Sequence, residues 1–292
     1  MNNLMEINLA IAGRARAGMD LTAAEIDELA TADVLSLGML ADEVRRAKVG
    51  DRVTFVRVHD WKPGDADVPE AATEVRLSAL PDTLDETISA IQAARAAAGP
   101  RLLSGFSLDL LVERAHTGWG TLPEVLKQLK DSGLDAVAEV PVDQLREASP
   151  ALRMAADAGL GIGCVSIQRP VAGDRTELLI RMRTLAAEFP QIKRASPLPR
   201  EQSTMVPTTG YDDVRIVALA RLAVSNVPHI QVDWSQYGPK LAQVALTFGA
   251  DDLDRVSPLD DESLGRRRMA GEDVKRNIAA AGFVAVERDP RA

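Results

Sequence analysis

The chain has 292 residues, of which 46% are hydrophobic, so it is long enough to bury one barrel-sized core. Its formal net charge of −9 argues against binding to nucleic acid, because that binding needs clustered cations that displace counterions. Its single cysteine, Cys164, excludes an internal disulfide, a cysteine-rich zinc site and an iron–sulfur cluster held by cysteines of this chain alone. The sequence has no apolar run of about 20 residues and no secretory signal pattern, so we expect a cytoplasmic protein that does not enter a membrane.

The first 50 residues predict helices. One begins near Leu21, and another runs from Asp33 to Arg46, with Gly50 beyond it as a stop. We expect residues 1–50 to form a helical segment that packs on a barrel formed by residues 51–292, all within one structural domain.

From residue 52 the pattern alternates between strands and helices. The candidate strands are 52–59, 74–80, 101–107, 136–141, 161–168, 192–198 and 229–236, with an eighth at either 283–288 or 251–257. The helices between them carry start signals, such as the capping boxes of Asp174 with Glu177 and Thr209 with Asp212. Strands that alternate with helices imply a parallel sheet. About eight strands favour a TIM-like (β/α) barrel, complete or partly open, although an open doubly wound sheet would give the same alternation.

Polar residues alternate with apolar ones along most of these strands, most clearly between His229 and Gln236. Because successive side chains of a strand point to opposite faces, the polar set is expected to point into the barrel. The candidate inward residues are Arg57, His59, Arg76, Ser78, Glu139, Ser166, Gln168, Arg194, Ser196, Gln231, Asp233 and Ser235. Those that come late in their strands are expected at the C-terminal rim, where barrel enzymes place their chemistry.

These residue types can perform acid–base chemistry on an anionic substrate. Glu139 or Asp233 would be the base and His59 the acid, and Arg57, Arg76 or Arg194 would bind the anion. The remaining serines and glutamines would line the substrate site. The arginines could equally pair with Glu139 or Asp233 as buried salt bridges that fill the barrel. The three histidines lack metal-ligand spacing, so we predict no metal site.

Several segments resemble a known enzyme family. They are residues 33–46, 50–55, 226–229, 238–245, 249–252 and 281–289. The chain resembles the radical-SAM enzymes of the futalosine route to menaquinone, aminofutalosine synthase and dehypoxanthine futalosine cyclase, and the related subunit of the synthase of the deazaflavin precursor FO. The resemblance covers most of the chain. It implies a barrel that holds a [4Fe–4S] cluster and SAM.

The chain departs from this family at its defining motif. The family carries C-x-x-x-C-x-x-C after the first strand, whereas residues 59–70 contain no cysteine and two prolines, with little room for a crossover helix. Carboxylates and imidazoles do not replace thiolates in holding such a cluster. Glu139 stands where the resemblance implies a contact to SAM in a glycine-rich segment, but residues 136–138 are Ala-Val-Ala, which argues against SAM binding. The sequence therefore predicts a degenerate member of the family, without a cluster and without any other cofactor.

Two functions remain open. The first is a non-radical partner or regulatory protein of menaquinone or deazaflavin biosynthesis, which binds a pathway enzyme or a small molecule in the barrel mouth. The second is a repurposed non-redox enzyme, of the lyase, isomerase or hydrolase type, that acts on a small polar substrate of nucleoside-like or carboxylated character.

Overall fold

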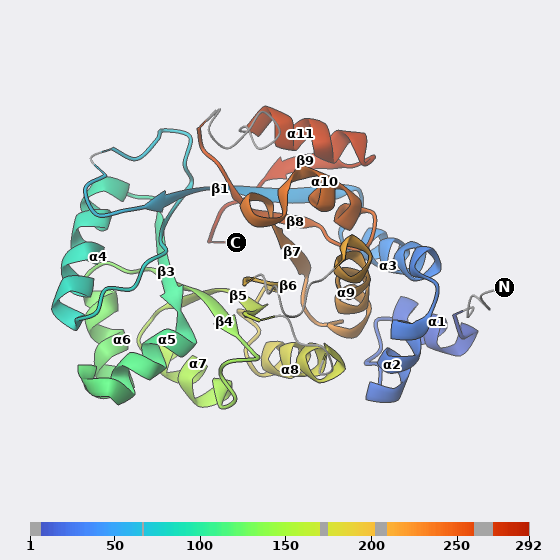
Figure 1. The fold of residues 1–292 in the computed structure, drawn as a ribbon, viewed down its shortest axis with the longest axis horizontal. Helices are drawn as coiled ribbons and strands as arrows, with labels where there is room; N and C mark the ends of the chain where they lie inside the picture. The colour runs from blue at the N-terminus through green and yellow to red at the C-terminus, as the bar shows by residue number, and fades with distance from the viewer. Residues whose placement is uncertain (1–6, 66, 170–174, 202–208, 260–270, 292) are drawn as a thin grey trace.

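Eight parallel strands form a closed barrel in the computed structural model, which describes residues 7–65, 67–169, 175–201, 209–259 and 271–291 (Figure 1). Each strand pairs with the next, and β1 pairs with both β8 and β2, which closes the ring. The predicted barrel is therefore confirmed, and it is complete. The strands are β1 Arg52–Trp61, β2 Glu74–Leu77, β3 Leu102–Ser107, β4 Ala136–Pro141, β5 Gly161–Ile167, β6 Arg194–Pro199, β7 His229–Asp233 and β8 Asp252–Val256.

A ninth strand, β9 (Val284–Glu287), lies outside the ring. It pairs in parallel with the first half of β1, with Arg52 opposite Val284, whereas β2 pairs with the second half, with Val58 opposite Glu74. Figure 1 shows β9 beside β1, under helix α11. Both segments that the sequence left as alternatives for the eighth strand are thus strands, and the one at 252–256 closes the barrel.

Helices surround the barrel, and each of strands β2 to β8 is followed by at least one of them. These helices are α4 Leu84–Ala98, α5 Leu108–Arg114, α6 Leu122–Asp131, α7 Ala148–Asp157, α8 Arg175–Glu188, α9 Gly210–Ala223, α10 Trp234–Leu246 and α11 Gly271–Ala280. The connector from β1 to β2 is the exception: its described residues, 62–65 and 67–73, contain no helix. This agrees with the short, proline-containing connector in the sequence.

Local capping explains where several helices begin. The Thr209 hydroxyl accepts a hydrogen bond from the backbone N–H of Asp212, and the Asp212 carboxylate accepts one from the backbone N–H of Thr209, which confirms the predicted capping box of α9. In α4 the box is made by Thr83 and Glu86. The box predicted for α8 involves Asp174, which lies outside the described residues.

Between residue 7 and the barrel the structure describes three helices: α1 Leu9–Arg16, α2 Ala23–Thr31 and α3 Val34–Val49. Helix α3 packs against α9, and the Arg45 guanidinium lies 4.1 Å from the ring centroid of Phe283, just before β9. A Cβ atom at Gly38 would lie 2.6 Å from the ring of Phe248, so the absence of a side chain allows this close packing. Within the described residues, no helix is both long and apolar enough to span a bilayer.

Candidate functional site

Charged side chains fill the middle of the barrel. Alternation along β8 places Asp252 and Asp254 on one face, and both are almost fully buried. Buried carboxylates are costly unless cations pair with them. The cations are Arg76 of β2, Arg194 of β6 and Arg288, which directly follows β9.

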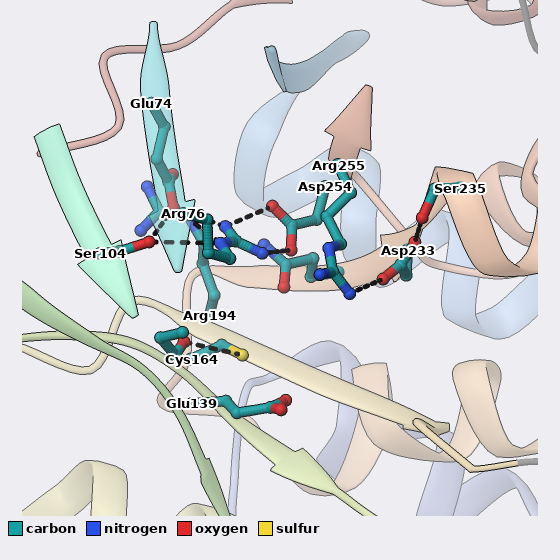
Figure 2. Close-up of polar contacts among 12 residues, drawn as sticks. Glu74, Arg76, Ser104, Glu139, Cys164, Arg194, Asp233, Ser235, Asp254 and Arg255 are labelled. Atoms are coloured by element: carbon teal, nitrogen blue, oxygen red, sulfur yellow. Dashed lines mark hydrogen bonds and ion pairs between the residues drawn. The ribbon is translucent and has the colours of Figure 1, made fainter. Parts of the chain in front are cut away.

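Arg76 makes the most complete of these pairs. Its guanidinium lies 2.7 Å from Glu74, 2.8 Å from Asp254 and 3.3 Å from the hydroxyl of Ser104 (Figure 2). Burial would raise the pKa of Asp254, but the charge and hydrogen bonds of Arg76, together with the charges of Arg200 and Arg288, hold that pKa well below its ordinary value. Asp254 is therefore ionised at neutral pH and neutralises Arg76.

Asp252 forms the second centre of charge. Its carboxylate accepts hydrogen bonds from Arg288 at 2.8 Å, Thr54 at 2.6 Å and Gln231 at 2.8 Å, and Arg194 lies 3.7 Å away. Burial opposes ionisation, but Arg288 and Arg194 lower the pKa of this group as well. Salt bridges do fill the barrel, but not with the predicted partners: Arg76 and Arg194 pair with the carboxylates of β8, and not with Glu139 or Asp233.

A third cluster lies nearer the C-terminal rim. Arg200, directly after β6, donates to Glu139 at 2.8 Å and to Asp233 at 3.4 Å, and it lies 3.6 Å from the sulfur of Cys164. Burial raises the pKa of the Cys164 thiol to about 12. A thiol with that pKa is protonated at neutral pH, so Cys164 is a poor nucleophile and a poor metal ligand.

Arg255 closes the rim between β8 and β1. It donates to Asp60 at 2.9 Å and to Ser78 at 3.0 Å, and it lies 3.6 Å from Asp233. Its backbone is left-handed, with φ of 53°, where the register between β8 and β1 shifts. This conformation is strained for a residue with a side chain, and such strain is concentrated at functional sites.

A cavity of about 310 Å³ opens at this rim. Both described non-glycine residues with positive φ, Phe106 and Arg255, line it. Asp109 also lines it, and burial, with a smaller contribution from the nearby charge of Glu139, raises the pKa of Asp109. The cavity is polar, with arginines and carboxylates from several strands facing the same space.

The structure divides the predicted site residues among several places. Arg76, Ser78, Glu139 and Gln168 line the rim cavity. Arg194 and Gln231 line a second cavity at the opposite end of the barrel, as Arg76 also does. Ser166 and Ser196 are buried opposite each other on β5 and β6, and their hydroxyls have no hydrogen-bond partner among the described residues.

The inward placement of Arg57 and His59 is wrong. The even-numbered residues of β1 point into the barrel, since Thr54 contacts Asp252 and Asp60 contacts Arg255. Arg57 and His59 are odd-numbered and lie on the opposite face. Arg57 instead makes a bidentate pair with Glu287 of β9, at 2.8 and 2.9 Å. His59 lies 3.3 Å from Asp65 in the connector and does not line either barrel cavity.

The seventh strand is also shorter than predicted. It ends at Asp233, whose carboxylate accepts hydrogen bonds from the backbone of Gln236 and the hydroxyl of Ser235, both at 2.9 Å. Asp233 is therefore the N-cap of α10, and Ser235 lies in the first turn of that helix. A carboxylate engaged by a helix cap and two arginines is poorly suited to act as a base.

Sequence reasoning missed Arg200, Arg255, Asp60 and Asp109. Arg200 follows its strand by one residue and Asp109 lies in the first turn of α5, so strand alternation did not include them. The pattern Asp252-Leu253-Asp254 was a usable signal for two inward carboxylates on β8. No sequence signal marks the bulge that aims Arg255 at the rim.

Comparisons with known proteins place this barrel among its relatives. Residues 189–290 match the family model described as the CofH/MqnC C-terminal region. The chain is 30% identical over 201 residues to aminodeoxyfutalosine synthase of Thermus thermophilus, covering 57% of this chain and 53% of that enzyme. It therefore spans about half the length of this relative.

A second relative is covered almost completely. The chain is 26% identical, over an alignment of 311 residues, to 5-amino-6-(D-ribitylamino)uracil–L-tyrosine 4-hydroxyphenyl transferase of Archaeoglobus fulgidus, covering 86% of this chain and 91% of that protein. In fold, the structure is similar to methylornithine synthase, with a TM-score of 0.68 and 14% identity over 96% of this chain and 98% of that one. HydG, a maturase of the [FeFe]-hydrogenase, follows with a TM-score of 0.65 and 12% identity over 95% and 74% of the two chains.

Proposed function

We propose that this chain is a non-radical, cluster-less protein of menaquinone or deazaflavin biosynthesis. The proposal starts from its homology to the radical-SAM enzymes of those pathways. In this role it binds a small polar compound at the barrel rim and acts as the partner or regulator of a pathway enzyme.

The observation that carries the proposal is the connector after β1. A [4Fe–4S] cluster of this family needs thiolates there, and residues 62–73 contain no cysteine. The one cysteine of the chain lies in β5, buried beside Arg200, with a raised pKa. The residues present therefore do not fit a cysteine-ligated cluster, and no step of the proposed function passes through one.

The arrangement of acid and base groups supports a binding role. His59, the expected acid, lies on the outer face of β1, and Asp233, one expected base, caps α10. Only Glu139 of that set lines the rim cavity, where Arg200 neutralises it at 2.8 Å. Arg200 and Arg255 remain well placed to hold the carboxylate or phosphate of a bound compound.

Anaerobic reconstitution with iron and sulfide tests the absence of the cluster. We expect iron and sulfide far below four atoms of each per chain, and no formation of 5′-deoxyadenosine from SAM under reducing conditions. A stoichiometric cluster would overturn the proposal. The partner role is tested by co-purification of the tagged chain with cluster-bearing homologues from the same cell, and retention of none of them would contradict it.

One observation favours the alternative of a repurposed acid–base enzyme. Asp109 has a raised pKa and shares the rim cavity with Glu139, and pairs of carboxyl groups with different environments serve as acid and base in many enzymes. In this alternative Asp109 donates a proton and Glu139 accepts one. Turnover of a pathway compound that Asp109→Asn and Glu139→Gln each abolish, with unchanged melting temperature, would select the enzyme over the binding protein.

A further inference from the structure

We propose that the N-terminal end of the barrel is a second ligand site, which takes a small organic anion that also carries a hydroxyl group. A cavity of about 430 Å³ opens there. The first residues of three strands, Leu102, Ala136 and Gly161, line it, and it reaches Arg76 and Asp254 in the middle of the barrel. This volume accommodates a small metabolite.

The charge around this cavity selects an anion. Its lining contains six basic side chains, namely Arg76, Lys130, Lys193, Arg194, Arg288 and Arg291, and three acidic ones, namely Glu74, Asp135 and Asp254. Arg76 already engages Glu74 and Asp254, and Asp135 pairs with Arg95 outside the lining and lies 4.0 Å from Arg291 of the lining. A protein with a net charge of −9 thus has a cavity whose lining is net positive.

The cations lie at two depths. Lys193 and Arg291 are exposed at the mouth, on the segment before β6 and the segment after β9. Arg194 and Arg288 lie deeper and share the carboxylate of Asp252. Burial and the neighbouring charge of Arg288 lower the pKa of Arg194, so an anion in the cavity would relieve repulsion between these two guanidinium groups.

Gln231 indicates what else the ligand carries. Its side-chain nitrogen donates to Asp252 at 2.8 Å, which fixes the orientation of the amide because an ionised carboxylate cannot donate in return. The other end of the amide is therefore its oxygen, which can only accept a hydrogen bond. Gln231 lines the cavity, and this oxygen is buried with no hydrogen-bond partner among the described residues. A buried acceptor without a donor is costly, so a ligand that supplies a hydroxyl donor would be bound selectively.

Titration calorimetry on the full chain tests the site, with L-malate, succinate and inorganic phosphate as probes and potassium chloride at matched ionic strength as the control. Malate and succinate carry the same two carboxylates, and only malate has a hydroxyl. We expect saturable 1:1 binding of malate, about tenfold tighter than that of succinate, which is the effect of one hydrogen bond to a buried group. Tighter binding of phosphate than of malate would assign the anionic group of the ligand as a phosphate ester. The binding of the two lysine variants described below would then be measured with phosphate.

Two variants locate the binding. Lys193→Gln removes an exposed cation at the mouth and is expected to weaken binding threefold to tenfold, whereas Lys240→Gln, on the exposed face of α10, is expected to leave it unchanged. Gln231→Leu is expected to abolish the preference for malate over succinate. The proposal is overturned if no probe binds saturably, if chloride gives the same heat, or if the two lysine variants behave alike. None of these outcomes depends on the rim cavity or on the proposed pathway role.

Discussion

Arg76 of β2 and Asp254 of β8 meet across the barrel interior, with a nitrogen-to-oxygen distance of 2.8 Å, although their strands are separated in the ring by β1. With Glu74 and Ser104 they form a polar layer that takes the place of an apolar barrel centre. Such a layer is stable only when each charge keeps its partner.

Breaking this pair should destabilise the protein strongly. Asp254→Asn leaves Arg76 largely buried with one carboxylate partner, and we expect the free energy of unfolding to fall by about 3–5 kcal/mol in urea titrations. Asp131→Asn, which removes an exposed pair with Lys127, is the matched control and should cost under about 1 kcal/mol. Equal losses from the two variants would contradict the role of the polar layer.

The carboxylates of β8 should make stability sensitive to acid. The pKa values of Asp252 and Asp254 are lower in the folded protein than the ordinary value near 4, so folding favours their ionised forms. Their contribution is complete above about pH 4 to 5 and is lost as the pH falls further, through the folded pKa values. Melting temperatures measured from pH 7 to pH 3 should therefore decline mainly below pH 5, and Asp252→Asn should flatten that decline. A decline that Asp252→Asn leaves unchanged would assign the acid sensitivity to other groups.

Two glycines should differ sharply in their tolerance of a methyl group. A Cβ atom at Gly163 would clash with the carbonyl oxygen of Ala138 on the neighbouring strand, whereas one at Gly210, at the start of α9, would meet no atom within 4 Å. We expect Gly163→Ala to cost about 1–3 kcal/mol or more, because β4 and β5 must move apart. Gly210→Ala should be neutral or slightly stabilising in the same denaturation assay, and a tolerated Gly163→Ala would show that the two strands can separate easily.

Cys164 should be unreactive in the folded protein. It is 3% exposed, and burial raises its pKa to about 12, so both access and thiolate content are low. Labelling with a thiol-reactive disulfide reagent at pH 8 should be slow in buffer and complete in denaturant. Rapid labelling of the native chain would mean that the sulfur is accessible from one of the two cavities.

Much of the fold could be predicted because each strand carries its own alternation or apolar run. The segments at 52–61, 136–141 and 161–167 lie within two residues of their predicted bounds. The N-terminal motif of α9 was readable because a capping box is local, involving only Thr209 and Asp212.

The site was harder to predict, because it depends on contacts between distant segments. Arg57 and His59 looked inward because they are polar, but Arg57 points outward to Glu287, a residue 230 positions later that no local pattern connects to β1. Asp233 looked like a free strand carboxylate, yet it ends the strand by capping α10. Arg255 reaches the rim because β8 bulges there. Residues with positive φ are usually glycine or asparagine, so an arginine gives no sign of the bulge in the sequence.

The side chains of Arg76 and Ala138 line both the rim cavity and the cavity at the N-terminal end. A molecule bound in the cavity at the N-terminal end that shifts the Arg76 guanidinium would therefore also change the lining of the rim cavity. Occupancy at either mouth would then change affinity at the other, and thermodynamic linkage makes that effect reciprocal. Substitutions at these two positions are therefore expected to change both specificities together.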